Sequence, residues 1–199
     1  MNTIALFLLA FIFYALSANS APSPSPVLDA YGKNLQTGVE YYVMPAARDG
    51  ESGGLLLAIV GNYTCPAGVS QFRSDEYGHP LIFTPVNPKK GVIRLSTDVN
   101  IKFSGSTICH ESNVWKLKYD KYIRQYAVMM GGVLGNPGSK TLDNWFKIEK
   151  TKDGYKFVFC LSVCSTCKVM CKDLGIVLDG NGMQRLAVSK DPLSVIFYK

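Results

Sequence analysis

The sequence has no long apolar run after its first twenty residues, and this absence excludes an ordinary transmembrane helix. Its one apolar run, Ile4–Leu16, is about 13 residues long, whereas a membrane-spanning helix needs about 20. Ala18 and Ser20 fit the small-x-small pattern that precedes signal-peptide cleavage. We predict a secretory signal peptide over residues 1–20. A retained anchor is the alternative, because no Lys or Arg precedes the run.

The sequence also lacks a concentrated run of charge. Its net charge is +6, from 21 Lys and Arg against 15 Asp and Glu, but the charged residues are scattered along the chain. The densest groups, Lys89-Lys90 and Lys116/Lys118/Lys121, are short. A protein that binds a phosphate backbone gathers its basic residues on one face or along one helix. We therefore expect no nucleic-acid partner.

Motifs of known enzyme classes are missing as well. There is no G-x-S-x-G, H-E-x-x-H or P-loop sequence, and the two histidines, His79 and His110, lack candidate partners nearby in sequence. The Q-x-W repeats of carbohydrate-binding domains are also absent. We predict a binding protein without cofactors rather than an enzyme. A glycosidase stays open, because paired carboxylates leave no sequence motif.

Helical periodicity is hard to find, whereas short runs rich in β-branched and aromatic residues recur and predict an all-β fold. Turn sequences such as Asp49-Gly50 and Asp153-Gly154 separate the runs. One domain is expected over residues 27–199, after a Pro/Ser-rich extension (21–26) that we expect to be extended and mobile. The predicted strands are Tyr41–Val43, Leu55–Val60, Leu81–Phe83, Val92–Leu95, Val99–Phe103, Val114–Tyr119, Tyr126–Met130, Trp145–Ile148, Tyr155–Phe159, Ile176–Leu178, Arg185–Val188 and Ser194–Phe197.

Six cysteines, an even number, follow the predicted cleavage site and indicate disulfides in a secreted chain. Six cysteines allow 15 pairings, so the sequence alone does not choose among them. The nested spacing C-x3-C-x2-C-x3-C suggests Cys160–Cys171 around Cys164–Cys167, which would leave Cys65 to pair with Cys109. A metal site or a redox-active C-x2-C is the alternative; we expect neither, because no histidine is near and no βαβ pattern surrounds the motif.

The sequon Asn62-Tyr-Thr64 predicts a glycan on Asn62 in a surface loop of a secreted protein.

Several segments resemble the signatures of the plant Kunitz-type (soybean trypsin inhibitor) family, and the resemblance covers essentially the whole mature chain. They are Val27–Val43, Asn144–Ile148, Tyr155–Cys160 and Asp173–Ile176. Further segments are similar to the miraculin-like branch of that family: Gly53–Leu55, Ser96–Phe103 and Gly131–Gly138. The resemblance implies a β-trefoil, a six-stranded barrel with a hairpin cap. It also implies three disulfides, Cys65–Cys109, Cys160–Cys171 and Cys164–Cys167.

The resemblance further implies an exposed loop that a serine protease binds like a substrate. Here that segment is Phe83–Ile93, which aligns with Pro88 at P3, Lys89 next, Lys90 at P1 and Gly91 at P1′. A Lys ammonium fits the carboxylate of a trypsin-like specificity pocket. We expect Pro85 and Pro88 to pre-set an extended backbone and so reduce the entropy lost on binding. The plain alternative is an ordinary exposed Pro/Lys turn.

Two residues depart from the strongest inhibitors of the family. Thr37 stands where those inhibitors carry an Asn that hydrogen-bonds the loop backbone, and Gly91 adds backbone freedom. We therefore expect modest inhibition by a monomeric plant-defence protein, secreted to the apoplast or delivered to the vacuole. The alternatives are a binding or storage protein with weak or no trypsin inhibition, and an inhibitor of cysteine or aspartic proteases that acts through another loop.

Overall fold

The computed structural model describes residues 23–47, 50–62, 65, 67–105, 111–168 and 170–199, so the predicted signal peptide lies outside it. The described residues form strands joined by turns, with two short 3-10 helices. None of their helices is long and apolar enough to cross a membrane. The elements are β1 (Glu40–Pro45), β2 (Leu55–Ala58), β3 (Gly68–Gln71), β4 (Leu81–Pro85), η1 (Pro88–Lys90), β5 (Val99–Phe103), β6 (Lys116–Asp120), β7 (Gln125–Met129), η2 (Leu142–Asn144), β8 (Lys147–Lys150), β9 (Tyr155–Phe159), β10 (Lys172–Leu178), β11 (Gln184–Val188) and β12 (Val195–Tyr198).

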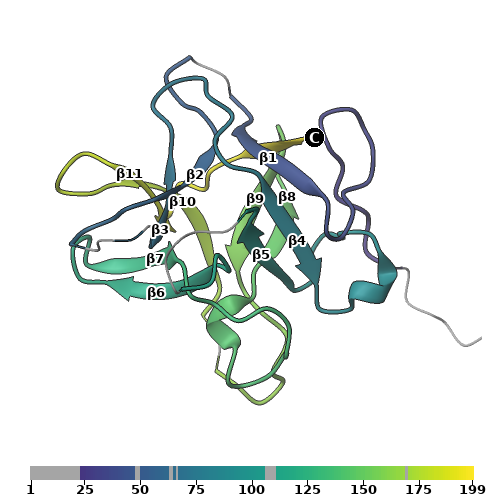
Figure 1. Ribbon diagram of the computed structural model, residues 1–199. Coiled ribbons are helices and arrows are strands. Elements are labelled where there is room, and N and C mark those ends of the chain that lie inside the picture. Colours follow the sequence, from purple (N-terminus) through teal and green to yellow (C-terminus); the bar gives the residue numbers. More distant parts are fainter. Residues whose placement is uncertain (1–22, 48–49, 63–64, 66, 106–110, 169) are drawn as a thin grey trace, which may run out of the picture.

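Six of the strands close into a ring. β1 pairs with β4, β4 with β5, β8 with β9, β9 with β12, and β12 returns to β1. The remaining junction is the bridge between Val99 of β5 and Phe146, the residue before β8. Closure removes the free edges that would otherwise template aggregation. Figure 1 shows these strands packed around the centre of the molecule.

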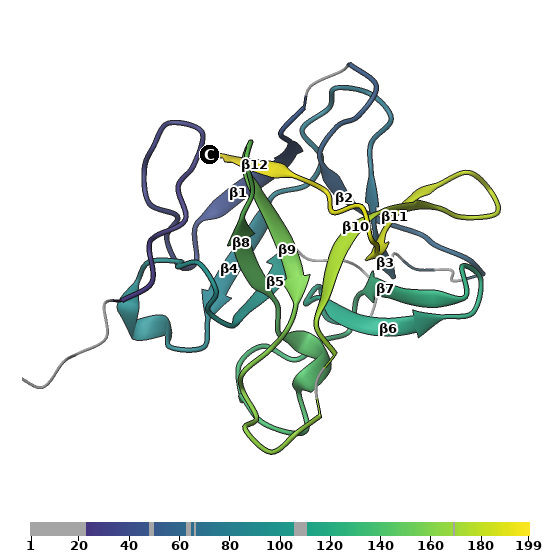
Figure 2. The same cartoon turned by 180° about the vertical axis from the view of Figure 1, so that it is seen from behind.

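Three hairpins, β2-β3, β6-β7 and β10-β11, cap the ring. They meet pairwise: Gly68 lies opposite Met129, Ala127 opposite Ala187, and Arg185 opposite Ser70. β10 also pairs with β9 and so connects the cap to the ring. In Figure 2 the cap hairpins lie beside the strands of the ring. A six-stranded ring with three hairpins is the β-trefoil arrangement.

Aromatic rings fill the space inside the ring of strands. Phe83 stacks on Phe157 with ring centroids 6.3 Å apart, and Phe197 meets Phe83 edge-on at 5.5 Å. Trp115, which is fully buried, contacts Phe157 edge-on at 5.5 Å. Burying one such side chain contributes about 1.5–3 kcal/mol, so this cluster is a large part of what holds the strands together.

Two of the expected disulfides lie in the described part of the chain, and they are the nested pair Cys160–Cys171 and Cys164–Cys167. Cys65 is disulfide-bonded. Cys109 lies outside the described residues, so the Cys65–Cys109 pairing stays a prediction.

Eleven of the twelve predicted strands coincide with observed ones, and one is wrong. Val92–Leu95 forms only isolated contacts: Val92 bridges to Gln36 and Arg94 to Pro26. The observed β3 was not predicted, because its sequence Gly-Val-Ser-Gln shows no apolar alternation.

Candidate functional site

Residues 86–91, between β4 and β5, are all exposed and contain the adjacent Lys89 and Lys90. The flanking residues Pro85 and Ile93 are buried, so the segment leaves the barrel and returns to it. Figure 1 shows η1 projecting from the right side of the molecule. The predicted site residues Pro88, Lys89, Lys90 and Gly91 are therefore together on the surface.

The expected extended backbone is wrong for this segment. Pro88–Lys90 form the 3-10 helix η1, in which the N–H of Lys90 donates to the carbonyl of Asn87 at 3.3 Å. Gly91 ends the helix in the left-handed conformation, with φ of 66°, and its N–H donates to the carbonyl of Pro88. The φ angle that proline imposes suits the first helical position as well as an extended chain, and a left-handed glycine is a common helix end.

Backbone hydrogen bonds hold both ends of the segment. The N–H of Val86 donates to the carbonyl of Asp98 at 2.9 Å, and the N–H of Thr37 donates to the carbonyl of Gly91 at 3.0 Å. The next contact is the N–H of Ile93, which donates to the carbonyl of Leu35 at 2.9 Å. Residues 35–37 thus lie directly behind the lysine segment.

Thr37 hydrogen-bonds this segment through its main chain. Its hydroxyl oxygen Oγ1 is buried and has no hydrogen-bond partner among the described residues. The sequence comparison with the family identified position 37 as a support of the loop, but the Thr37 side chain donates no hydrogen bond to it.

The N-terminal extension lies against the same region. The N–H of Leu95 donates to the carbonyl of Ser25 at 2.9 Å, and Nη1 of Arg94 donates to the carbonyl of Pro24 at 2.8 Å. A cavity of about 70 Å³ is lined by residues that include Pro24, Arg94 and Lys90. Hydrogen bonds from the Leu95 main chain and the Arg94 side chain therefore contact the extension at Ser25 and Pro24, while its mobility stays a prediction.

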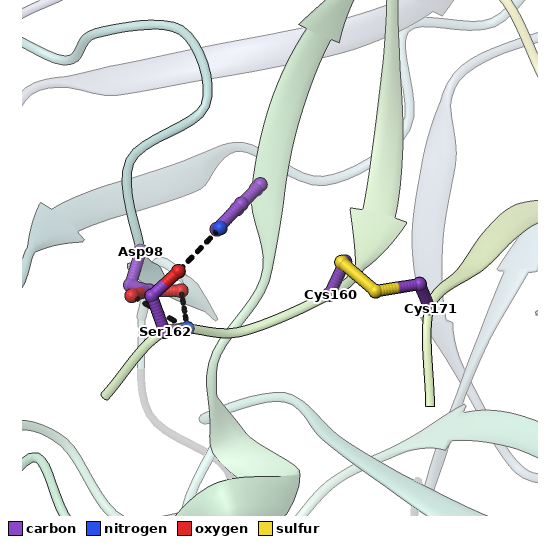
Figure 3. Close-up of a disulfide and its surroundings, with 5 residues drawn as sticks. Asp98, Cys160, Ser162 and Cys171 are labelled. Carbon is purple, nitrogen blue, oxygen red and sulfur yellow. Dashed lines mark hydrogen bonds between the residues drawn. A yellow bond between two sulfur atoms is a disulfide. The ribbon is translucent and has the colours of Figure 1, made fainter. Parts of the chain in front are cut away.

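A buried carboxylate joins the lysine segment to the cysteine-rich one. Both oxygens of Asp98 accept the N–H of Ser162 at 3.0 Å, close to the Cys160–Cys171 disulfide (Figure 3). Burial raises the pKa of Asp98, while the Ser162 N–H and the charge of Lys147 act in the opposite direction. Sequence reasoning missed this contact, because Asp98 and Ser162 are 64 positions apart and no local pattern links them.

Comparison with known proteins agrees with this architecture. The Kunitz legume family model, described as "Trypsin and protease inhibitor", matches residues 27–199. The chain belongs to the plant Kunitz family. Its members are protease inhibitors rather than enzymes.

Individual relatives match over nearly their whole length. Miraculin of Synsepalum dulcificum is 43% identical over 217 residues, covering 100% of this chain and 98% of the relative. Kunitz trypsin inhibitor 5 of Arabidopsis thaliana is 42% identical, covering 98% of this chain and 97% of the relative. Soybean trypsin inhibitor, solved in complex with porcine pancreatic trypsin, superposes with a TM-score of 0.71 at 28% identity, covering 88% of this chain and 99% of that one.

The remaining predicted site is the glycan acceptor. Asn62 is exposed in a turn, while Tyr63 and Thr64 lie outside the described residues. Within the described residues, no group of three or more His, Cys, Asp and Glu side chains could hold a metal ion.

Proposed function

We propose that this Kunitz protein is a secreted inhibitor of trypsin-like serine proteases that acts in plant defence, with Lys90 as its P1 residue. The observation that carries the proposal is an exposed lysine on a segment whose two ends are bonded to the barrel by Asp98 and Thr37. A trypsin-like pocket ends in a buried carboxylate, which the Lys90 ammonium would neutralise. The complex of soybean trypsin inhibitor with trypsin supports the choice of partner.

The anchoring contacts suit an inhibitor that survives cleavage. Hydrolysis of the Lys90–Gly91 peptide bond would leave a carboxylate on Lys90 and an amine on Gly91. Gly91 stays bonded to Thr37 through its own carbonyl, and the Val86 side of the break stays bonded to Asp98. The two new ends therefore remain close, and religation with loss of the same water can compete with release.

The helical turn opposes tight binding. A protease binds its substrate extended, so the 3-10 bonds of Lys90 and Gly91, at 3.3 and 3.2 Å, must open first. Each such bond contributes about 0.5–1.5 kcal/mol, so opening both weakens inhibition by about 5- to 150-fold. This observation favours the second candidate function, a binding or storage protein with weak trypsin inhibition.

Titration of trypsin with the purified protein separates the two functions. Lys90→Ala should weaken inhibition by about 30-fold or more, since removing one member of a buried charge pair costs about 2–5 kcal/mol. Lys89→Ala is the matched control, because it removes a neighbouring lysine of the same helix that is also exposed. Equal effects of the two substitutions would refute P1 status for Lys90, and no inhibition by wild type at micromolar concentration would leave the binding or storage role.

The remaining proposals concern the mature protein. We infer cleavage near Ala21, secretion to the apoplast or vacuole, a Cys65–Cys109 disulfide, a glycan on Asn62 and a monomeric state. Intact-mass measurement of the plant-expressed protein, before and after glycosidase and reduction, checks the cleavage, the glycan and the number of disulfides. Peptide mapping of the unreduced protein checks the Cys65–Cys109 pairing, and fractionation of the tissue checks the destination. A sedimentation measurement checks the monomer.

A further inference from the structure

A surface hollow of about 520 Å³ lies next to the predicted glycan acceptor. Asn62 of the β2-β3 loop lines it together with residues 118–122, at the end of the β6-β7 hairpin. Sites for small molecules typically have volumes of about 300–1,000 Å³. Figure 1 shows β6 and β7 at the lower left and η1 at the right, and the reversed view in Figure 2 also keeps them on opposite sides. The hollow is therefore separate from the lysine segment.

Tyrosine rings form the apolar wall of the hollow. Tyr119 and Tyr122 line it and are 50% and 52% exposed. Tyr119 also meets Tyr126 of the neighbouring strand edge-on, with ring centroids 5.6 Å apart. A tyrosine offers an apolar face and a polar hydroxyl. This combination suits a sugar, which carries C–H groups on the faces of its ring and hydroxyls around its edge.

The ring of Tyr122 lies directly against the chain at the acceptor. A Cβ added to Gly61 would come within 2.6 Å of Cδ2 of Tyr122, so a larger residue at position 61 would displace the ring. Gly61 also has a φ of 56°, in the left-handed region that favours glycine. Because Gly61 directly precedes Asn62, a sugar attached to Asn62 starts beside the Tyr122 ring.

A buried carboxylate holds the tyrosine turn in place. Asp120 is only 5% exposed; its Oδ1 accepts the N–H of Tyr122 at 2.8 Å, and its Oδ2 accepts Nη2 of the buried Arg185 at 3.0 Å. Lys118 and Lys121 are exposed at the hollow and can donate to the hydroxyl and acetamide oxygens of a sugar. The wall is thus formed before any sugar binds, which reduces the ordering cost.

We propose that this hollow binds the glycan of the chain itself, with the first N-acetylglucosamine on Asn62 packed on the ring of Tyr122. This docking rests on the glycan proposed above but goes beyond it, because a sequon predicts attachment and no position for the sugar. Attachment favours this occupant, since a tethered group has a local concentration at the millimolar level. Contacts too weak to hold a free sugar therefore suffice. The docked glycan covers Tyr119 and Tyr122 and leaves Lys90 open.

The first test measures glycan release from the folded protein, made in a host that attaches oligomannose glycans. An endoglycosidase that cuts between the first two sugars should act on Tyr122→Ala about 2- to 12-fold faster than on wild type, the ratio that one contact of an aromatic ring supports. Tyr122→Phe keeps the ring and should react like wild type. Tyr31→Ala is the matched control and should also react like wild type, because it removes a tyrosine that is 70% exposed outside the hollow.

A second measurement needs no enzyme. If the first sugar packs on Tyr122, the methyl protons of its acetamide group lie near the face of an aromatic ring. Their NMR signal in the folded wild type should therefore be shifted upfield from its position on the urea-unfolded protein. Tyr31→Ala should keep this shift, and Tyr122→Ala should abolish it.

The outcomes separate the docking from the glycan. Equal release rates for wild type and Tyr122→Ala, or a methyl signal at its unfolded position, would overturn the docking and leave the glycan on Asn62 standing. An intact mass without added sugar would overturn both. Micromolar binding of free chitobiose, the disaccharide of the first two sugars, by Asn62→Gln would show instead that the hollow takes a free saccharide.

Discussion

Thr37→Val tests how the lysine segment is supported. The substitution replaces a buried hydroxyl, which has no partner among the described residues, by a methyl group of similar size. Burying an unpaired hydroxyl costs about 1–3 kcal/mol in proteins. Because the residue as a whole is half-buried, we expect the low end, a gain of about 1 kcal/mol. For a chain of this size that raises Tm by about 2–4 °C.

Thr37→Ser is the matched control for this prediction. It keeps the unpaired hydroxyl and removes only a methyl group, which costs about 0.8 kcal/mol. Thermal unfolding followed by circular dichroism should therefore move the two variants in opposite directions from wild type. A Thr37→Val protein that melts below wild type would refute the reasoning, because the hydroxyl would then have a partner such as a bound water.

The same position links stability to inhibition. Thr37→Val should leave trypsin inhibition unchanged, since the main-chain bond from Thr37 N–H to Gly91 remains. Thr37→Asn carries an amide with two donor hydrogens on a longer side chain. One new bond to the loop backbone should tighten inhibition by about 2- to 12-fold.

Three further changes test other contacts. Gly91→Ala should lower stability by about 1–2 kcal/mol, because Gly91 has a positive φ that disfavours alanine. A Cβ there meets nothing within 4 Å, so no steric clash adds to this cost. Unfolding in urea measures the loss. Asp98→Asn should gain stability relative to wild type as pH rises from about 4 through the raised pKa of Asp98, because the buried carboxylate is disfavoured once charged; a Tm difference constant from pH 3 to 7 would contradict this. Asp120→Ala should cost about 3–5 kcal/mol, because it leaves the fully buried Arg185 without the carboxylate 3.0 Å from Nη2; the double variant Asp120→Ala/Arg185→Met, which removes both charges of the pair, should cost less in the same urea measurement.

The sequence predicted most of the strands because their apolar residues also form the barrel core. Phe83, Phe157 and Phe197 belong to runs with clear strand composition, and all three are buried together. β3 was not predicted because neighbouring hairpins of the cap bury it. Ser70 is polar, and it is buried where it pairs with Leu56 and Arg185. Contacts between hairpins leave no periodic pattern in a single segment.

The candidate site was located from the sequence but its shape was not. The resemblance identified Thr37 and Pro88–Gly91, and the structure brings Thr37 and Gly91 into hydrogen-bond contact. The conformation of η1 was not predicted, because the φ angle of proline suits both a helical and an extended backbone. The choice between them depends on Gly91, which accepts the left-handed conformation that ends the helix.

Asn100→Ala tests whether the loop at residues 131–138, between β7 and η2, is held from within the protein. The change removes one acceptor and one donor, and so leaves the N–H of Gly135 and the carbonyl of Asn144 without their partner. Two lost partners cost about 2–4 kcal/mol together, since each costs about 1–3 and the half-buried Gly135 recovers part from water. Hydrogen exchange at the Gly135 amide should then accelerate, whereas Asn100→Asp with its carboxyl protonated keeps the acceptor for Gly135 and a donor for Asn144, and should preserve most of the protection. Trypsin inhibition should stay unchanged in both variants, because the lysine segment is bonded to the main chain of Asp98 and not to the side chain of Asn100. Unchanged exchange at Gly135 in Asn100→Ala would mean that the loop keeps its shape without the buried amide, and the reasoning that Asn100 holds it would be refuted.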